Sequence, residues 1–150
     1  MSALKRHILC VVFAILVLAY AQECIGQPII KPKGGPTIKT IEPKPAFEFI
    51  QKNRRNSKFV VLDIRTPQEF QDGHIEGAIN IDYRSPTFGA DLDRLEKTNT
   101  YFVYCRIGRR SGDAIGIMIR KGFTSIYRTP GDIVAWRAAG LPLVKGAKNT

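Results

Sequence analysis

A single cysteine lies close to three arginines in the stretch YFVYCRIGRRSGDA, residues 101–114. Cys105 follows an apolar run, and Arg106, Arg109 and Arg110 come directly after it in the chain. The thiolate is the nucleophilic form of cysteine, and nearby cations and the backbone N–H groups at a helix start stabilise it. This spacing predicts a reactive cysteine that acts on an anionic substrate.

The alternative is that Cys105 is a small buried apolar residue, as most lone cysteines are. An apolar burial site would not attract three guanidinium groups, and Gly108 adds a position suited to a tight loop. The residues around Cys105 therefore favour the nucleophile.

The segments on either side of this loop alternate between strand and helix patterns. Strands are predicted at 59–64, 78–83, 101–104 and 125–127, with a short edge strand around Ile38 and Ile41. Helices are predicted from Pro45, from Pro67 to about Asp72 after a capping box, over 91–97, between the cysteine loop and Gly122, and from Asp132 to Ala139. This order predicts one α/β domain with a central, mainly parallel sheet of about five strands flanked by helices. Ligands of such sheets bind beyond the carboxyl ends of the strands, which is where Cys105 falls.

The N-terminal residues have the pattern of a secretory signal peptide. Lys5 and Arg6 precede an apolar stretch, and Ala19-Tyr20-Ala21 offers a cleavage site. We expect residues 1–21 to be the signal peptide and residues 22–39, rich in proline, glycine and lysine, to be a tether. The folded domain is then expected over 40–145 and a C-terminal tail over 146–150. The protein is predicted to be periplasmic or secreted, with no stable membrane span after cleavage; an uncleaved membrane anchor is the alternative.

The chain of 150 residues carries a formal net charge of +10. A basic surface can bind nucleic acid or anionic lipid. Here the charge is spread over the tether, loops and helix ends, and an exported protein rarely meets nucleic acid. A small anionic substrate is the partner that the sequence favours, and no nucleic acid is predicted.

Several separate motifs resemble a single-domain rhodanese, a thiosulfate sulfurtransferase, of an exported type. They are VVLDIRTPQEFQDGHIEGAINIDY, the loop CRIGRR and GFTSIYRTPGDIVAWRAAGLPL, which together cover about residues 40–145. The resemblance implies a three-layer rhodanese-like fold. It also implies that Cys105 takes the outer sulfur of thiosulfate, or of a related donor, as a persulfide and passes it to cyanide or a thiol.

The resemblance assigns roles to further residues and needs neither a metal nor an organic cofactor. The substrate-binding residues would be Arg106, Ile107, Gly108, Arg109, Arg110 and Ser111. Asp63, Arg65, His74 and Trp136 would be structural. A Cys–His catalytic pair would require His74 to approach Cys105, but its place in the HIEGA segment favours a structural hydrogen bond.

Two other functions fit the same fold less well. The related cysteine phosphatases use a Cys-x5-Arg loop, whereas here Ser111 stands at that position and Arg110 gives the shorter Cys-x4-Arg loop of sulfur transfer. A binding or sulfur-carrier module without turnover would not need a reactive thiol.

Two points remain open in the sequence. Family members carry a glycine pair before the last helix, where this chain has Pro130-Gly131, so the wall of the site is expected to differ. Cys24 is either a free cysteine of the tether or a disulfide partner of Cys105 or of another chain. No protein partner is specified.

Overall fold

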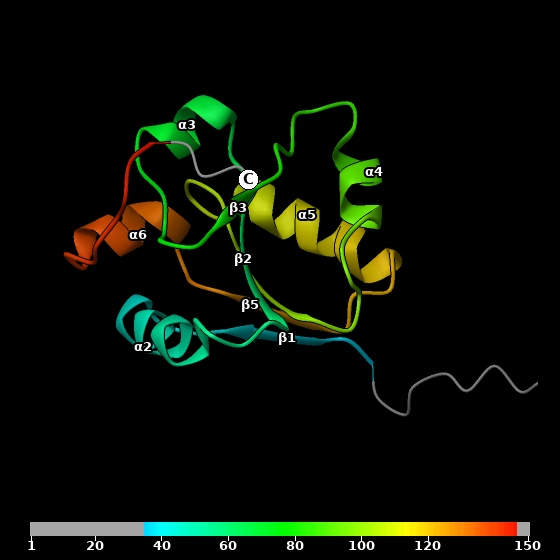
Figure 1. Cartoon of the computed structure of the whole chain (residues 1–150), viewed down its shortest axis with the longest axis horizontal. Helices are drawn as coiled ribbons and strands as arrows, with labels where there is room; N and C mark the ends of the chain where they lie inside the picture. Colours follow the sequence, from blue (N-terminus) through cyan, green and yellow to red (C-terminus); the bar gives the residue numbers. More distant parts are fainter. Residues whose placement is uncertain (1–34, 147–150) are drawn as a thin grey trace, which may run out of the picture. The chain divides into compact units, whose positions relative to one another are not determined.

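The computed structural model describes residues 35–146, and these belong to one compact unit that begins at Gly35. Strands and helices alternate along it (Figure 1). The strands are β1 (Thr37–Thr40), β2 (Phe59–Asp63), β3 (Ile79–Asn80), β4 (Thr100–Tyr104) and β5 (Ser125–Arg128). The helices are α2 (Pro43–Asn53), α3 (Pro67–Gln71), α4 (Phe88–Asp93), α5 (Arg109–Arg120) and α6 (Asp132–Ala138).

All five strands pair in parallel, in the order β1-β5-β4-β2-β3. β4 lies in the middle of the sheet, between β5 and β2, and is buried along most of its length. A parallel strand covered on both faces is expected to be apolar throughout, as the run YFVY is. The expected five-stranded parallel α/β fold is confirmed. Cys105 follows directly after the carboxyl end of its central strand, β4.

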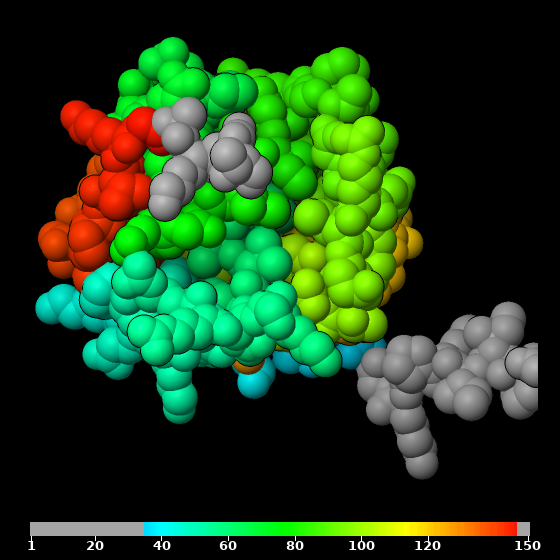
Figure 2. Space-filling model, viewed as in Figure 1, coloured from blue at the N-terminus to red at the C-terminus, as the bar shows by residue number. Residues whose placement is uncertain are grey.

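The side chains of β4 alternate between two hydrophobic cores, as the period of a strand requires. Tyr101 and Val103 join the core that α4 and α5 cover. Phe102 and Tyr104 join the core on the opposite face, which is covered by α2, α6 and Phe70 of α3. In the space-filling view, α2 in cyan and teal covers the lower part of the visible face (Figure 2).

The predicted elements are present, with shifted boundaries. β1 begins at Thr37, within the residues predicted as tether, and pairs with β5. α2 begins at Pro43 rather than Pro45. β3 is only two residues long, and the side chain of Asn80 then donates to the backbone oxygens of Asp63 and Arg65. α4 begins at Phe88 and ends at Asp93, earlier than predicted.

The predicted signal peptide, most of the tether, Cys24 and all but the first residue of the predicted tail lie outside the described residues. Between residues 35 and 146, no helix is long and apolar enough to cross a membrane.

Candidate active site

Cys105 follows directly after β4 and is 1% exposed. Its loop runs to Gly108, and α5 begins at Arg109. β4 is the central strand: β5 pairs with its first part, through Phe102, and β2 pairs with it as far as Tyr104, the residue before the cysteine. The nucleophile thus rests on one of the most enclosed parts of the sheet.

Gly108 gives the loop its turn. Its φ is +100°, a left-handed value that glycine adopts without strain, and its backbone N–H donates to Sγ of Cys105 at 3.3 Å. The guanidinium of Arg128 in β5 donates to the Gly108 carbonyl at 3.3 Å and steadies the turn from outside. Within residues 35–146, the amides of Ile107 and Arg109 donate to no protein acceptor. A loop of such free N–H groups around a sulfur atom is suited to holding an anion.

A pocket of about 500 Å³ opens above the sulfur. Its lining includes four of the six residues predicted to bind substrate, together with Tyr83, Arg84 and Asp113. The full set is Tyr83, Arg84, Cys105, Arg106, Ile107, Arg109, Arg110 and Asp113. Gly108 and Ser111 do not line it: Gly108 faces the sulfur with its N–H, and Ser111 is fully buried.

Arg110 is held in place by an acidic side chain from α3. Its two terminal nitrogens donate to the two carboxylate oxygens of Glu69 at 2.7 and 2.8 Å. These bonds lower the pKa of Glu69 to about 2 and raise the pKa of Arg110. Glu69 also completes the predicted capping box with Thr66, so one carboxylate both caps α3 and orients an arginine of the site.

Arg106 and Arg109 are exposed and take part in none of the ion pairs found in residues 35–146. Their charges are therefore available to an anion that enters the pocket. Ile107, which follows Arg106 in the chain, is 63% exposed and also lines the pocket.

Asp132 at the start of α6 is a site residue that the sequence did not point to. It is fully buried, and Oδ2 accepts hydrogen bonds from the backbone N–H of Cys105 at 2.7 Å and from the Ser111 hydroxyl at 2.6 Å. Its φ is +46°, which costs a non-glycine residue roughly 1 kcal/mol. The two left-handed residues here are thus Gly131, directly before α6, and Asp132, its first residue, one position later than the Pro130-Gly131 pair noted in the sequence. The one sequence feature that could have pointed to Asp132 is its place directly after Gly131, at the start of a predicted helix.

The four residues predicted to be structural are all buried in the domain: Asp63, Arg65, His74 and Trp136. Asp63 and Arg65 form a buried ion pair at 2.6 Å, and Arg65 also donates to the Gly73 carbonyl. Burial disfavours the charge on Arg65, but the hydrogen bonds and charge of Asp63 outweigh it and raise the pKa of Arg65. Next to this pair, burial raises the pKa of the Tyr104 hydroxyl, which accepts from the Ile75 N–H.

His74 and Trp136 make contacts away from the sulfur. His74 is buried, stacks on Phe70 at 3.6 Å between ring centroids, and places Nδ1 2.9 Å from the Phe70 carbonyl. Trp136 is fully buried in α6 and donates to the Pro142 carbonyl at 3.0 Å. Neither forms a hydrogen bond with Cys105.

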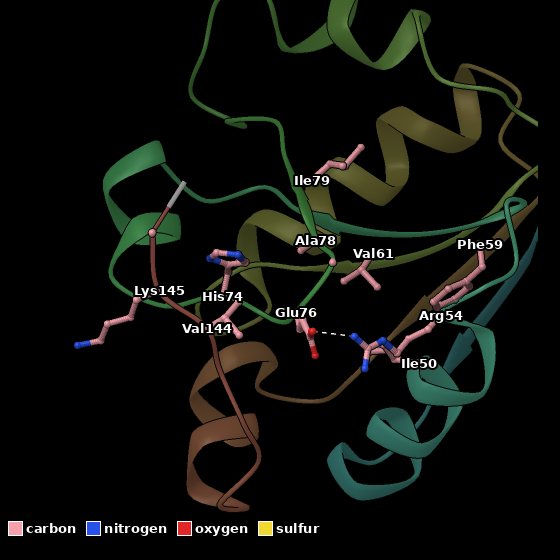
Figure 3. Close-up of a pocket in the computed structure, with 12 residues that line it drawn as sticks. Ile50, Arg54, Phe59, Val61, His74, Glu76, Ala78, Ile79, Val144 and Lys145 are labelled. Atoms are coloured by element: carbon pink, nitrogen blue, oxygen red, sulfur yellow. Dashed lines mark hydrogen bonds and ion pairs between the residues drawn. The ribbon is translucent and has the colours of Figure 1, made fainter. Parts of the chain in front are cut away.

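A second hollow, of about 510 Å³, lies between α2 and the segment that leads into β3 (Figure 3). His74 and the apolar side chains of Ile50, Val61 and Ile79 line it, and the ion pair of Arg54 and Glu76 spans it at 2.7 Å. It shares no lining residue with the cysteine pocket, and no cysteine, serine or threonine is among its lining residues. The chemistry of the described residues therefore points to the smaller pocket at Cys105.

A family profile and several known proteins are similar to this chain. Residues 48–139 match the sequence profile of the family described as Rhodanese-like domain. The chain is 36% identical over 104 residues to thiosulfate sulfurtransferase GlpE of Pseudomonas putida, which covers 67% of this chain and 86% of the relative. It is 32% identical over 97 residues to the probable adenylyltransferase/sulfurtransferase MoeZ of Mycobacterium tuberculosis, covering 65% of this chain but only 24% of that protein.

Among solved structures, a rhodanese-related protein from Thermoplasma volcanium superposes with a TM-score of 0.61 at 29% identity. The match covers 72% of this chain and 99% of that one.

Proposed function

Since this chain belongs to the family of rhodanese-like domains, we propose that it is a sulfurtransferase that works through a persulfide on Cys105. The donor would be thiosulfate or a related small anion, and the acceptor cyanide or a thiol. One observation carries this proposal: the Cys105 sulfur, with the Gly108 N–H aimed at it, lines a pocket ringed by arginines.

The proposed reaction has two displacement steps at sulfur. The Cys105 thiolate attacks the outer sulfur of thiosulfate, the sulfur–sulfur bond breaks, and its electron pair leaves with sulfite. The acceptor thiolate or cyanide then attacks the outer sulfur of the persulfide and returns the electron pair to Cys105. The first step takes Cys105 from a thiolate to a persulfide and the second returns it to a thiolate, so the two steps together need no external oxidant or reductant.

The pocket supplies what both steps need. The charges of Arg106 and Arg109 attract the donor and stabilise departing sulfite, while Gly108 and its neighbouring amides hold the sulfur that is transferred. The guanidinium of Arg110 has a fixed position in the pocket wall, because its two terminal nitrogens both donate to the Glu69 carboxylate.

We also propose that the protein acts in the periplasm or outside the cell, because residues 1–21 have the pattern of a cleaved signal peptide. Intact mass of the protein recovered from the periplasmic fraction tests this. A mass equal to that of the whole chain would contradict cleavage.

The function is tested by treating the protein with thiosulfate, recording its intact mass, and then adding cyanide. We expect a mass gain of one sulfur atom and the formation of thiocyanate, both absent in Cys105→Ser. Cys24→Ser is the matched control, since it makes the same substitution at another cysteine and leaves Cys105 in place, and it should keep both results. A folded, reduced wild-type protein that gains no sulfur from thiosulfate and forms no thiocyanate would contradict the proposal and favour a binding module.

A further inference from the structure

Asp132 lies under the cysteine loop in a backbone conformation that a glycine would adopt more easily. Its φ is +46°, it follows Gly131 at +67°, and its side chain is fully buried. Buried carboxylates in strained backbone are held there by the contacts they make. The side-chain hydrogen bonds of Asp132 come from Cys105 and from Ser111, the residues on either side of the cysteine loop.

The carboxylate ties together the two ends of this loop. Oδ2 accepts from the N–H of Cys105, where the loop begins, and from the hydroxyl of Ser111, in the first turn of α5. Two backbone bonds also join α6 to the loop, with α6 as the donor: the Ile133 N–H donates to the Cys105 carbonyl and the Val134 N–H to the Arg106 carbonyl. The first turn of α6 therefore fixes the loop, and none of its residues lines the cysteine pocket.

The charge of Asp132 is not matched by a cation. Both of its hydrogen-bond donors are neutral groups, and none of the ion pairs in the described part of the chain includes it. Its second oxygen, Oδ1, is buried without any partner in the structure. A buried charge is screened less than a surface charge, so its field reaches the neighbouring sulfur and any anion bound beside it.

We propose that Asp132 is a positioning residue with two effects: it fixes the Cys105 loop, and its charge limits how tightly the pocket holds sulfur anions. The second effect rests on the proposed function. Sulfite must leave the arginine-lined pocket in every turnover, and a negative charge beneath the loop weakens its retention. The charge of Asp132 thereby partly offsets the attraction of the arginines for anions.

The test compares Asp132→Asn, which keeps the shape and removes the charge, with Asp132→Gly, which removes the hydrogen bonds as well. Alkylation of Cys105 is followed by peptide mass spectrometry with anionic iodoacetate and with neutral iodoacetamide. The ratio of the two rate constants reports the local potential, because the thiolate fraction cancels from it. We expect Asp132→Asn to raise this ratio about three- to tenfold.

Two further variants separate the effect of the Asp132 charge from the effect of its hydrogen bonds. Asp113→Asn removes the same charge from the exposed rim of the pocket, where water screens it, and should raise the ratio less than about twofold. Ser111→Ala removes one hydrogen bond of Asp132 and keeps the charge, so its ratio should match the wild type.

Sulfur transfer gives the second readout. Asp132→Asn should lower the KM for thiosulfate and strengthen inhibition by sulfite, each about threefold or more. Asp132→Gly should lower kcat, because the loop has lost its support from below.

A folded Asp132→Asn protein with an unchanged alkylation ratio would overturn the effect of the charge. A folded Asp132→Gly protein with wild-type kcat would overturn the positioning role. If the ratio rises in Asp132→Asn while no form of the protein accepts sulfur, the electrostatic effect on Cys105 stands and the proposed sulfurtransferase function is wrong.

Discussion

Arg110 differs from the other arginines of the cysteine loop because its charge is matched inside the protein. Glu69 contacts both of its terminal nitrogens, and the Arg110 side chain is only 15% exposed. Arg106 and Arg109 are exposed and belong to no ion pair of the described residues. One arginine therefore joins α5 to α3, while the other two are free to act on the substrate.

The pair of Glu69 and Arg110 makes stability depend on pH. The pKa of Glu69 is lowered to about 2 from 4.5, chiefly by the hydrogen bonds from Arg110. A lowered pKa contributes stability that is complete above the unfolded value, near 4.5, and is lost as pH falls toward 2. We expect Glu69→Gln to lower the free energy of unfolding at pH 7 by about 1–2 kcal/mol, discounted for partial exposure of the pair. Urea titration at pH 7 and near pH 2.5 measures this.

The difference between the two proteins should shrink at the lower pH. Near pH 2.5 Glu69 is protonated in the unfolded chain, and folding must release this proton before the pair with Arg110 forms. Glu48→Gln, an exposed carboxylate of α2 in no ion pair of the described residues, is the control and should change stability by less than about 0.5 kcal/mol at either pH. An equal loss for Glu69→Gln at both values would show that the contribution is not electrostatic.

The sequence identifies a site residue when its neighbours in the chain reveal its role. Cys105 could be predicted because the arginines and Gly108 follow it directly. Glu69 could be predicted only as a cap, because Arg110 lies 41 residues further along the chain. Asp132 lies 27 residues from Cys105, and no local pattern links a carboxylate to a backbone N–H at that distance.

At the scale of elements, the turn from β4 into α5 depends on one glycine. A Cβ added at Gly108 would lie 2.9 Å from Nη2 of Arg128, and the φ of +100° would be strained for any other residue. We expect Gly108→Ala to lower the free energy of unfolding by about 1–2 kcal/mol and to slow formation of the Cys105 persulfide at least about tenfold. Thermal unfolding and mass spectrometry after thiosulfate treatment measure the two effects.

Gly77→Ala is the matched variant, because Gly77 also has a positive φ, +80°, and open space around it. Its loss of stability should be similar, while its sulfur loading should equal that of the wild type. Equal loading in both variants would mean that the Gly108 turn does not hold the transferred sulfur.

Elements were predictable to different degrees. The strands β2 and β4 follow from continuous apolar runs, and α3 from its capping box, since each pattern is local. β1 was placed partly in the tether because its residues are exposed, and only its pairing with β5 makes it a strand. β3 is cut short by tertiary hydrogen bonds of Asn80 that no local pattern contains.

At the scale of the whole molecule, the net charge of +10 favours the approach of small anions. We expect kcat/KM for thiosulfate to fall severalfold when ionic strength rises from about 0.02 to about 0.5 M, because the Debye length shrinks from about 20 Å to about 4 Å. Steady-state kinetics at constant pH measure this. Alkylation by neutral iodoacetamide should change far less, and a salt-independent kcat/KM would show that the arginines act only by direct contact.

The central position of β4 has a consequence for partial unfolding. Opening of β1 breaks its pairing with β5, and opening of β3 breaks its pairing with β2, but neither breaks a pair of β4. Amide hydrogen exchange from the two edges can therefore proceed while the strand that carries Cys105 stays paired. The edge strands can open without displacing the nucleophile, so the geometry of its loop depends on the global stability of the domain and not on local opening at the sheet edges.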